Sequence, residues 1–249
     1  SDLSCRNLLA VYDLFEENGT AYAITEYLDG LILTDFLARN PAKPAVSAAQ
    51  NIALQLCAGL EALHGGGCVH AGLGPDSVWM CESGTVKIVA YANMLFAAGA
   101  PAPFQPEWSP EAAPPEAYSK SSAFTQASDL YALAALIYRM FAGYFPQNAK
   151  ERIAGGAHAA LSTLGTGASP AAAAAVDRAL SLKPKERFSS VRTFVAAFTG
   201  VEPKETTLDL ANKKMRERGL GGRIAGFVAS ALMMLAGAAL IAAYFFYLT

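Results

Sequence analysis

The sequence predicts an α+β fold, in which a short strand-rich N-terminal part leads into a mainly helical domain and then into one long apolar helix. Two apolar-rich runs, 8–14 and 21–27, flank Asn18–Gly19, a dipeptide that favours the positive φ angles of a tight hairpin turn. In the middle of the chain, apolar residues recur at helical spacing in several segments. Residues 224–248 contain no charged residue, and a run of this length can cross a bilayer.

Local start and stop signals place the elements between these landmarks. Five helices are expected: one around 35–38 capped by Thr34, one from Ser47 to Gly65, one from Ser128 to Gly143, one from Ser169–Pro170 through Leu180, and one bearing Val191, Val195 and Phe198. Short strands are expected over 78–80 and 86–89, on either side of a Ser83–Gly84 turn.

Composition favours a well-packed globular domain, because 53% of the 249 residues are hydrophobic and only 16% are charged. The charges are unevenly distributed. Residues 1–203 carry 13 basic and 18 acidic residues, whereas residues 204–223 carry 6 and 3. An acidic globular part argues against a nucleic-acid partner. The four cysteines show no metal-ligand spacing, so no metal site is predicted.

A stretch between Leu63 and Val89 organises the domain. It contains H-A-G-L-G-P-D-S, beginning at His70, and V-K-I-V, which continues as A-Y-A at residues 90–92. These segments resemble the H-R-D-L-K-P-x-N catalytic loop and the D-F-G motif of Ser/Thr protein kinases. On that register His70 and Pro75 match, and the chemically active positions are replaced by Gly72, Gly74, Ser77 and Ala90.

The replacements remove the chemistry that phosphoryl transfer requires. Catalysis of this kind depends on a group that accepts the proton of the substrate hydroxyl, on magnesium ligands and on a cation near the transferred phosphate. Gly72 cannot accept a proton and Ala90 cannot bind a metal. Ser77 offers only a neutral hydroxyl where magnesium prefers carboxylates and phosphates. The resemblance therefore implies a protein kinase-like fold without turnover and without a cofactor, with weak ATP binding or none.

Residues that support the kinase fold are retained where the resemblance places them. Pro114-Pro115-Glu116 resembles the A-P-E motif, and Arg187 is its expected partner across the large lobe. Asp129 stands where the family holds the backbone of the catalytic loop, and His70 would pack beneath the cleft. Segment 93–115 offers only Ser109 as a phosphorylatable hydroxyl. The backbone at Glu26 and Leu28 corresponds to the hinge that grips adenine.

The resemblance divides the chain into four parts: a partial small lobe with the hinge over 1–30, the large lobe over 31–200, a basic juxtamembrane linker over 201–223, and a transmembrane helix over 224–248. Because the basic residues precede the apolar segment, the positive-inside rule predicts a single-pass protein of the cell membrane with its kinase-like domain in the cytoplasm. The spacing Gly222-x-x-x-Gly226-x-x-x-Ser230 is a candidate surface for homodimers within the bilayer.

The leading hypothesis is a membrane-anchored pseudokinase of the bacterial Ser/Thr kinase type, which serves as a scaffold or allosteric signalling partner for a protein still to be identified. One alternative is a kinase with unorthodox chemistry, in which Asp76 takes the role of the base. Another is a decayed or incomplete product, although the helical periodicity argues against it.

Overall fold

A computed structural model describes residues 5–40, 42–89, 108–119 and 123–201, and these residues form the expected α+β architecture. The described residues all belong to one compact unit, Ser1–Glu202. Within those residues, no helix has the length and apolar character needed to cross a bilayer. The expected transmembrane helix over 224–248 and most of the basic linker lie outside the described residues.

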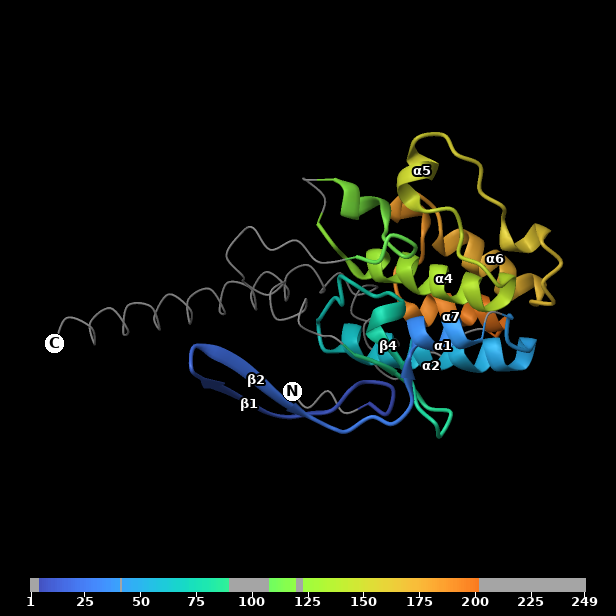
Figure 1. Ribbon diagram of the computed structural model, residues 1–249. Helices are drawn as coiled ribbons and strands as arrows, with labels where there is room; N and C mark the ends of the chain where they lie inside the picture. The colour runs from blue at the N-terminus through green and yellow to red at the C-terminus, as the bar shows by residue number, and fades with distance from the viewer. Residues whose placement is uncertain (1–4, 41, 90–107, 120–122, 202–249) are drawn as a thin grey trace, which may run out of the picture. The chain divides into compact units, whose positions relative to one another are not determined.

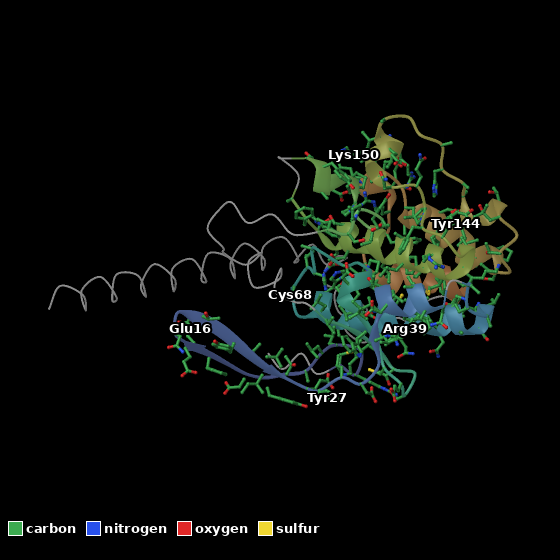
Figure 2. All side chains as sticks on the ribbon, viewed as in Figure 1. Glu16, Tyr27, Arg39, Cys68, Tyr144 and Lys150 are labelled. Atoms are coloured by element: carbon green, nitrogen blue, oxygen red, sulfur yellow. The ribbon has the colours of Figure 1, made fainter. Side chains whose placement is uncertain are left out.

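The predicted N-terminal hairpin is present. Strands β1, Val11–Glu17, and β2, Thr20–Thr25, pair antiparallel as a two-stranded sheet. Asn18 and Gly19 form the turn with φ angles of 52° and 72°, as the dipeptide predicts. Phe15 stacks on Tyr22 across the strands, with ring centroids 5.1 Å apart. Figure 2 shows Glu16 near the tip of this hairpin.

A second, three-stranded antiparallel sheet connects the hairpin to the helices. It consists of β3, Leu31–Ile32, β4, Val78–Met80, and β5, Val86–Ile88, in the order β3-β4-β5. The β4–β5 hairpin was predicted from the sequence, whereas the two-residue β3 was not. Backbone hydrogen bonds link residues 7–9 to Ile88, so the segment before β1 is attached to β5.

Helices are the main secondary structure of the described residues. They are α1, Leu33–Arg39; α2, Val46–Gly65; α4, Gln126–Ala142; α5, Ala149–Ile153; α6, Pro170–Ala179; and α7, Val191–Thr199. Four 3-10 turns accompany them: η1, Pro75–Ser77; η2, Pro115–Tyr118; η3, Leu161–Thr163; and η4, Pro184–Glu186. In Figure 1, α4 crosses the helical body, and it packs against both α2 and α6.

Helix α4 forms the centre of the core. Each residue from Ser128 to Phe141 is buried, so the helix is enclosed on all sides. A helix buried around its whole circumference is typical of the interior of a large domain. Its end agrees with the prediction, because Gly143 adopts the left-handed conformation at φ 88°.

Three of the predicted caps are wrong. Helix α1 begins at Leu33, so Thr34 lies inside the helix. Helix α2 begins at Val46 after Ala45, and Ser47 therefore does not cap it. Helix α4 is capped by Thr125, and Ser128 is the third residue of a reciprocal capping box. The cap at Ser169 is confirmed, since its side chain accepts a hydrogen bond from the Ala172 amide.

Candidate functional site

A single buried carboxylate fixes the loop between α2 and β4. Asp129, which has no exposed surface, accepts hydrogen bonds from the His70 amide at 2.7 Å and the Ala71 amide at 2.9 Å. The His64 Nε2 atom lies 2.8 Å from the same carboxylate. Ala71 adopts a left-handed φ of 52°, a conformation that costs energy for a residue with a Cβ. Asp129 thus stabilises a strained loop through its backbone, independently of the side chains that the loop carries.

His70 lies fully buried inside this loop. Its Nε2 atom is 3.2 Å from the Val89 carbonyl oxygen, so that nitrogen carries the proton and donates the hydrogen bond. Burial lowers the pKa of the imidazole, and the nearby Asp129 carboxylate opposes that effect only in part. The neutral ring ties the loop to Val89, the residue directly after β5.

Two of the four positions where the resemblance places reactive residues, Gly74 and Ser77, are filled by contacts within the domain. Gly74 packs so closely on Ser109 that an added Cβ would lie 3.0 Å from the Ser109 Cβ. The Ser77 hydroxyl donates to the Gly74 carbonyl at 3.0 Å and accepts from the Gly74 amide at 2.9 Å. Gly72 contributes no side chain, and Ala90 lies outside the described residues. No group of three or more His, Cys, Asp or Glu residues able to hold a metal ion occurs in the described part of the chain.

Asp76, the candidate for a displaced base, is held by a neighbouring helix. The Thr34 hydroxyl of α1 donates to Asp76 Oδ1 at 2.5 Å. Asp76 is exposed, and Pro75, which precedes it, is buried at the start of η1. Thr34 was predicted to cap a helix, but its hydroxyl donates to the side chain of a residue 42 positions away.

Glu116 and Arg187 form the ion pair that the resemblance implied. The Arg187 guanidinium donates to both carboxylate oxygens of Glu116, at 2.8 and 3.0 Å. Ser128 Oγ donates to Glu116 Oε1 at 3.0 Å, so the capping box of α4 is joined to the pair. Both charged side chains are buried, at 0% exposure for Arg187 and 6% for Glu116.

The two predicted hinge positions differ in whether their backbone groups already form hydrogen bonds within the domain. The Glu26 amide donates to the Ala10 carbonyl at 3.0 Å, and its own carbonyl accepts from the Thr25 hydroxyl at 3.2 Å. No hydrogen bond to the Leu28 backbone occurs among the described residues. Tyr27, between them, is 93% exposed and is labelled in Figure 2. The backbone at Leu28 is thus the part of the hinge that remains available to a ligand.

Contacts that the sequence did not predict hold the hinge against the sheet. The Trp79 indole N–H donates to the Asp29 carbonyl at 2.5 Å. Lys87 Nζ lies 2.6 Å from Glu26 Oε1. Burial raises the pKa of Glu26, but the hydrogen bonds from Lys87 and from the Ala10 amide more than offset this, and the net pKa is lowered.

Gly30 completes this arrangement. It has a positive φ of 97°, and a Cβ there would lie 2.1 Å from the Met80 carbonyl oxygen. The chain after the hinge therefore passes directly against β4. None of these contacts, nor the one between His64 and Asp129, is visible in local sequence patterns, since the partners lie 50 to 65 residues apart.

Comparison with known proteins gives one family. Residues 1–198 match the model of the protein kinase domain. Similar relatives include the serine/threonine-protein kinase Pkn1 of Myxococcus xanthus, 29% identical over 202 residues that cover 76% of this chain and 28% of the relative. Another is PksC of Streptomyces coelicolor, 28% identical over 215 residues, with coverages of 76% and 37%. The chain thus spans only about a fifth to two fifths of the length of such curated relatives.

Solved structures agree on the fold. The chain titled "PpkA-294 apo form" superposes with a TM-score of 0.65 at 25% identity, covering 78% of this chain and 69% of the other. The PknI kinase domain of Mycobacterium tuberculosis gives a TM-score of 0.61 at 24% identity, with coverages of 80% and 73%.

Proposed function

This chain belongs to the protein kinase family, and from that premise we propose that it is a catalytically inactive member that acts as a scaffold or allosteric partner in signalling at a membrane. One observation carries the proposal. The loop that would perform catalysis is fixed by Asp129, yet Gly72 offers no base and the hydroxyl of Ser77 is bound by the neighbouring Gly74. A loop that is held in a fixed conformation but lacks reactive side chains is suited to binding and unsuited to phosphoryl transfer.

Weak or absent nucleotide binding is part of the same proposal. Adenine recognition at a hinge needs free backbone groups and space beside them. Here the Glu26 backbone groups are already bonded, and Trp79 donates to the Asp29 carbonyl at the end of the hinge. The Leu28 backbone alone favours residual binding. Phosphate binding is disfavoured because Ser77 and Ala90 stand where the resemblance places the two magnesium ligands.

The rival function is phosphoryl transfer with Asp76 as the base. It is favoured only by the proximity of Asp76 to the loop, and the hydrogen bond from Thr34 already occupies one oxygen of this carboxylate. A base must reach the proton of the substrate hydroxyl within hydrogen-bond distance. Asp76 would first have to release Thr34 and turn away from α1.

Membrane attachment is proposed from the sequence. The apolar segment 224–248 is long enough to span a bilayer, and the basic residues that precede it favour a cytoplasmic kinase-like domain. A reporter enzyme that is active only in the cytoplasm, fused before residue 1, tests this orientation: it should be active, and inactivity in a protein that is inserted in the membrane would contradict the proposal.

Two measurements test inactivity. The purified 249-residue chain is incubated with γ-labelled ATP, magnesium or manganese, and a basic protein substrate, beside an Asp76→Asn variant. We expect no incorporation in either sample, and incorporation that Asp76→Asn abolishes would establish the rival function. In thermal unfolding, ATP with magnesium at 100 times its dissociation constant would add about 2.7 kcal/mol. We expect no magnesium-dependent shift.

A further inference from the structure

The buried charges of this domain are paired, with one exception. Among the described residues, the buried charged side chains are Glu116, Asp129, Arg139 and Arg187. Glu116 and Arg187 form a bidentate ion pair, and Asp129 accepts hydrogen bonds from three donors. Arg139, in the last turn of α4, has only 8% of its surface exposed, and its Nη1 atom has no partner. Across the described residues it forms neither an ion pair nor a side-chain hydrogen bond.

This arrangement is unusual for arginine. Its guanidinium carries five N–H donors and remains charged in proteins. Arginine on a helix normally buries its aliphatic stem and extends its charged end into water. Burial lowers the pKa of Arg139, and no carboxylate of the described residues opposes that effect. The Nη1 end of the side chain is therefore removed from water without a compensating contact from the described residues.

The position in the helix explains only part of this. A cation in the last turn interacts favourably with the partial negative charge of a helix C-terminus. That interaction is weak, and an exposed lysine would provide it without burial. A methionine at the same position would fill similar space in the core without a charge. Neither reason accounts for an Nη1 donor that is buried without a partner among the described residues.

We propose that Arg139 is the anchor of a site for an oxyanion, a carboxylate or phosphate group carried by a binding partner. The planar guanidinium matches such groups with two parallel hydrogen bonds, and this is the partner that Arg139 lacks within the described residues. The site uses no residue of the degenerate catalytic loop. It gives the scaffold a preference for acidic or phosphorylated segments, and its failure would leave the proposed inactivity untouched.

A second cation lies near the same end of α4. The Gly143 amide donates to the Arg139 carbonyl at 3.0 Å, so Gly143 is one turn beyond Arg139. A Cβ placed on Gly143 would lie 3.6 Å from the Lys43 Cβ. The Lys43 Nζ atom donates to the Thr166 carbonyl at 3.3 Å, an exposed bond to a neutral acceptor that an anion can replace. Lys43 thus adds to the positive potential around α4's C-terminal end, within a domain that is acidic as a whole.

Thermal unfolding of the full 249-residue chain in mild detergent tests the site with acetate and inorganic phosphate as probes, each compared with sodium chloride at equal ionic strength. The variants are Arg139→Met and, as a control for general salt effects, Lys183→Met, whose side chain is 80% exposed. In chloride, we expect Arg139→Met to unfold at the same temperature as the parent or higher, because an unpaired buried charge has been removed.

With a probe anion, we expect the midpoint of the parent and of Lys183→Met to rise by several degrees, and that of Arg139→Met to stay constant. A rise with phosphate alone assigns a phosphate site, and a rise with acetate assigns a carboxylate site. The proposal is overturned by any of three results: no rise in the parent with either anion, an equal rise in Arg139→Met, or an Arg139→Met protein that is much less stable in chloride or does not unfold cooperatively.

Discussion

Replacing Arg187 with methionine should destabilise the domain more than any comparable change at a surface arginine or lysine. The five N–H groups of Arg187 all have acceptors. Two go to the Glu116 carboxylate, and the others go to the carbonyls of Ala127, Ser181 and Leu182 at 2.8, 2.8 and 3.1 Å. Its guanidinium also lies 5.0 Å from the centre of the Tyr131 ring.

The expected magnitude follows from what the substitution leaves behind. Methionine fills the space, but it leaves the Glu116 carboxylate buried with only the Ser128 hydroxyl as a side-chain donor. Breaking a buried pair from one side costs on the order of 3–5 kcal/mol. For a domain of this size, about 2–4 °C accompanies each kcal/mol, so the midpoint should fall by about 6–20 °C.

Urea unfolding, followed by the fluorescence of Trp79 and Trp108, provides the assay. The matched control is Lys183→Met, which breaks an exposed pair with Glu186 and should cost less than about 1 kcal/mol. A Glu116→Leu, Arg187→Met double variant should recover much of the loss, since no charge remains buried. If Arg187→Met lowers stability by no more than the Lys183 control, the reasoning about the buried pair is refuted.

Three further predictions concern stability. Gly30→Ala should fold poorly or lose several kcal/mol in urea unfolding, since its φ is 97° and its Cβ would collide with the Met80 carbonyl; an unchanged midpoint would contradict this. Ser169→Ala should cost about 1 kcal/mol in the same assay, because the Ala172 amide loses its cap. The pKa of His70 is lowered by burial, so the unfolded chain binds a proton that the folded protein does not as pH falls below about 6.5, and the free energy of unfolding should decrease there. A His70→Met variant should lose that part of the slope, and an unchanged slope would count against this assignment.

Elements with a local cause were predictable from the sequence. The Asn18–Gly19 turn and the end of α4 at Gly143 depend on positive φ angles that few residues adopt, so the residues themselves identify the conformation. The Ser169 cap is another case, since its acceptor group and the amide it binds are three residues apart.

Predictions failed where a polar side chain had a distant partner. Ser128 lies in a capping box and also donates to Glu116, so it sits inside the helix that it was expected to begin. Thr34 donates to Asp76, which is 42 residues away. His64 belongs to none of the motifs in the sequence, and it contacts Asp129 across 65 residues. Such pairings are set by tertiary packing, which a local pattern does not contain.

The site was predictable in outline because the kinase-like motifs fix an order of residues along the chain. The motifs placed Asp129 beside the loop and Glu116 opposite Arg187, and the structure has both contacts. The close packing of Ser109 against Gly74 could not be predicted, since it depends on how closely two loops approach each other. The unpaired Arg139 was also invisible, because burial and the lack of a partner are properties of the folded core.

The presence of the residues that hold the kinase fold together does not by itself distinguish an active kinase from an inactive one. Removing one member of the Glu116–Arg187 pair leaves a buried charge, so stability alone keeps both residues whether or not the protein catalyses a reaction. Positions that serve catalysis are different, because removing an active-site group commonly costs no stability. Under the proposed inactivity, loss of function erases the reactive residues first and leaves the buried pairs, and this accounts for Gly72 and Ser77 at positions where the resemblance places reactive residues. Arg139 is different, because it is buried and its Nη1 atom has no partner among the described residues, so a contribution to stability does not explain its presence. Residues that bind a partner should accordingly be sought where a buried charged group lowers the stability of the domain and has no partner within it.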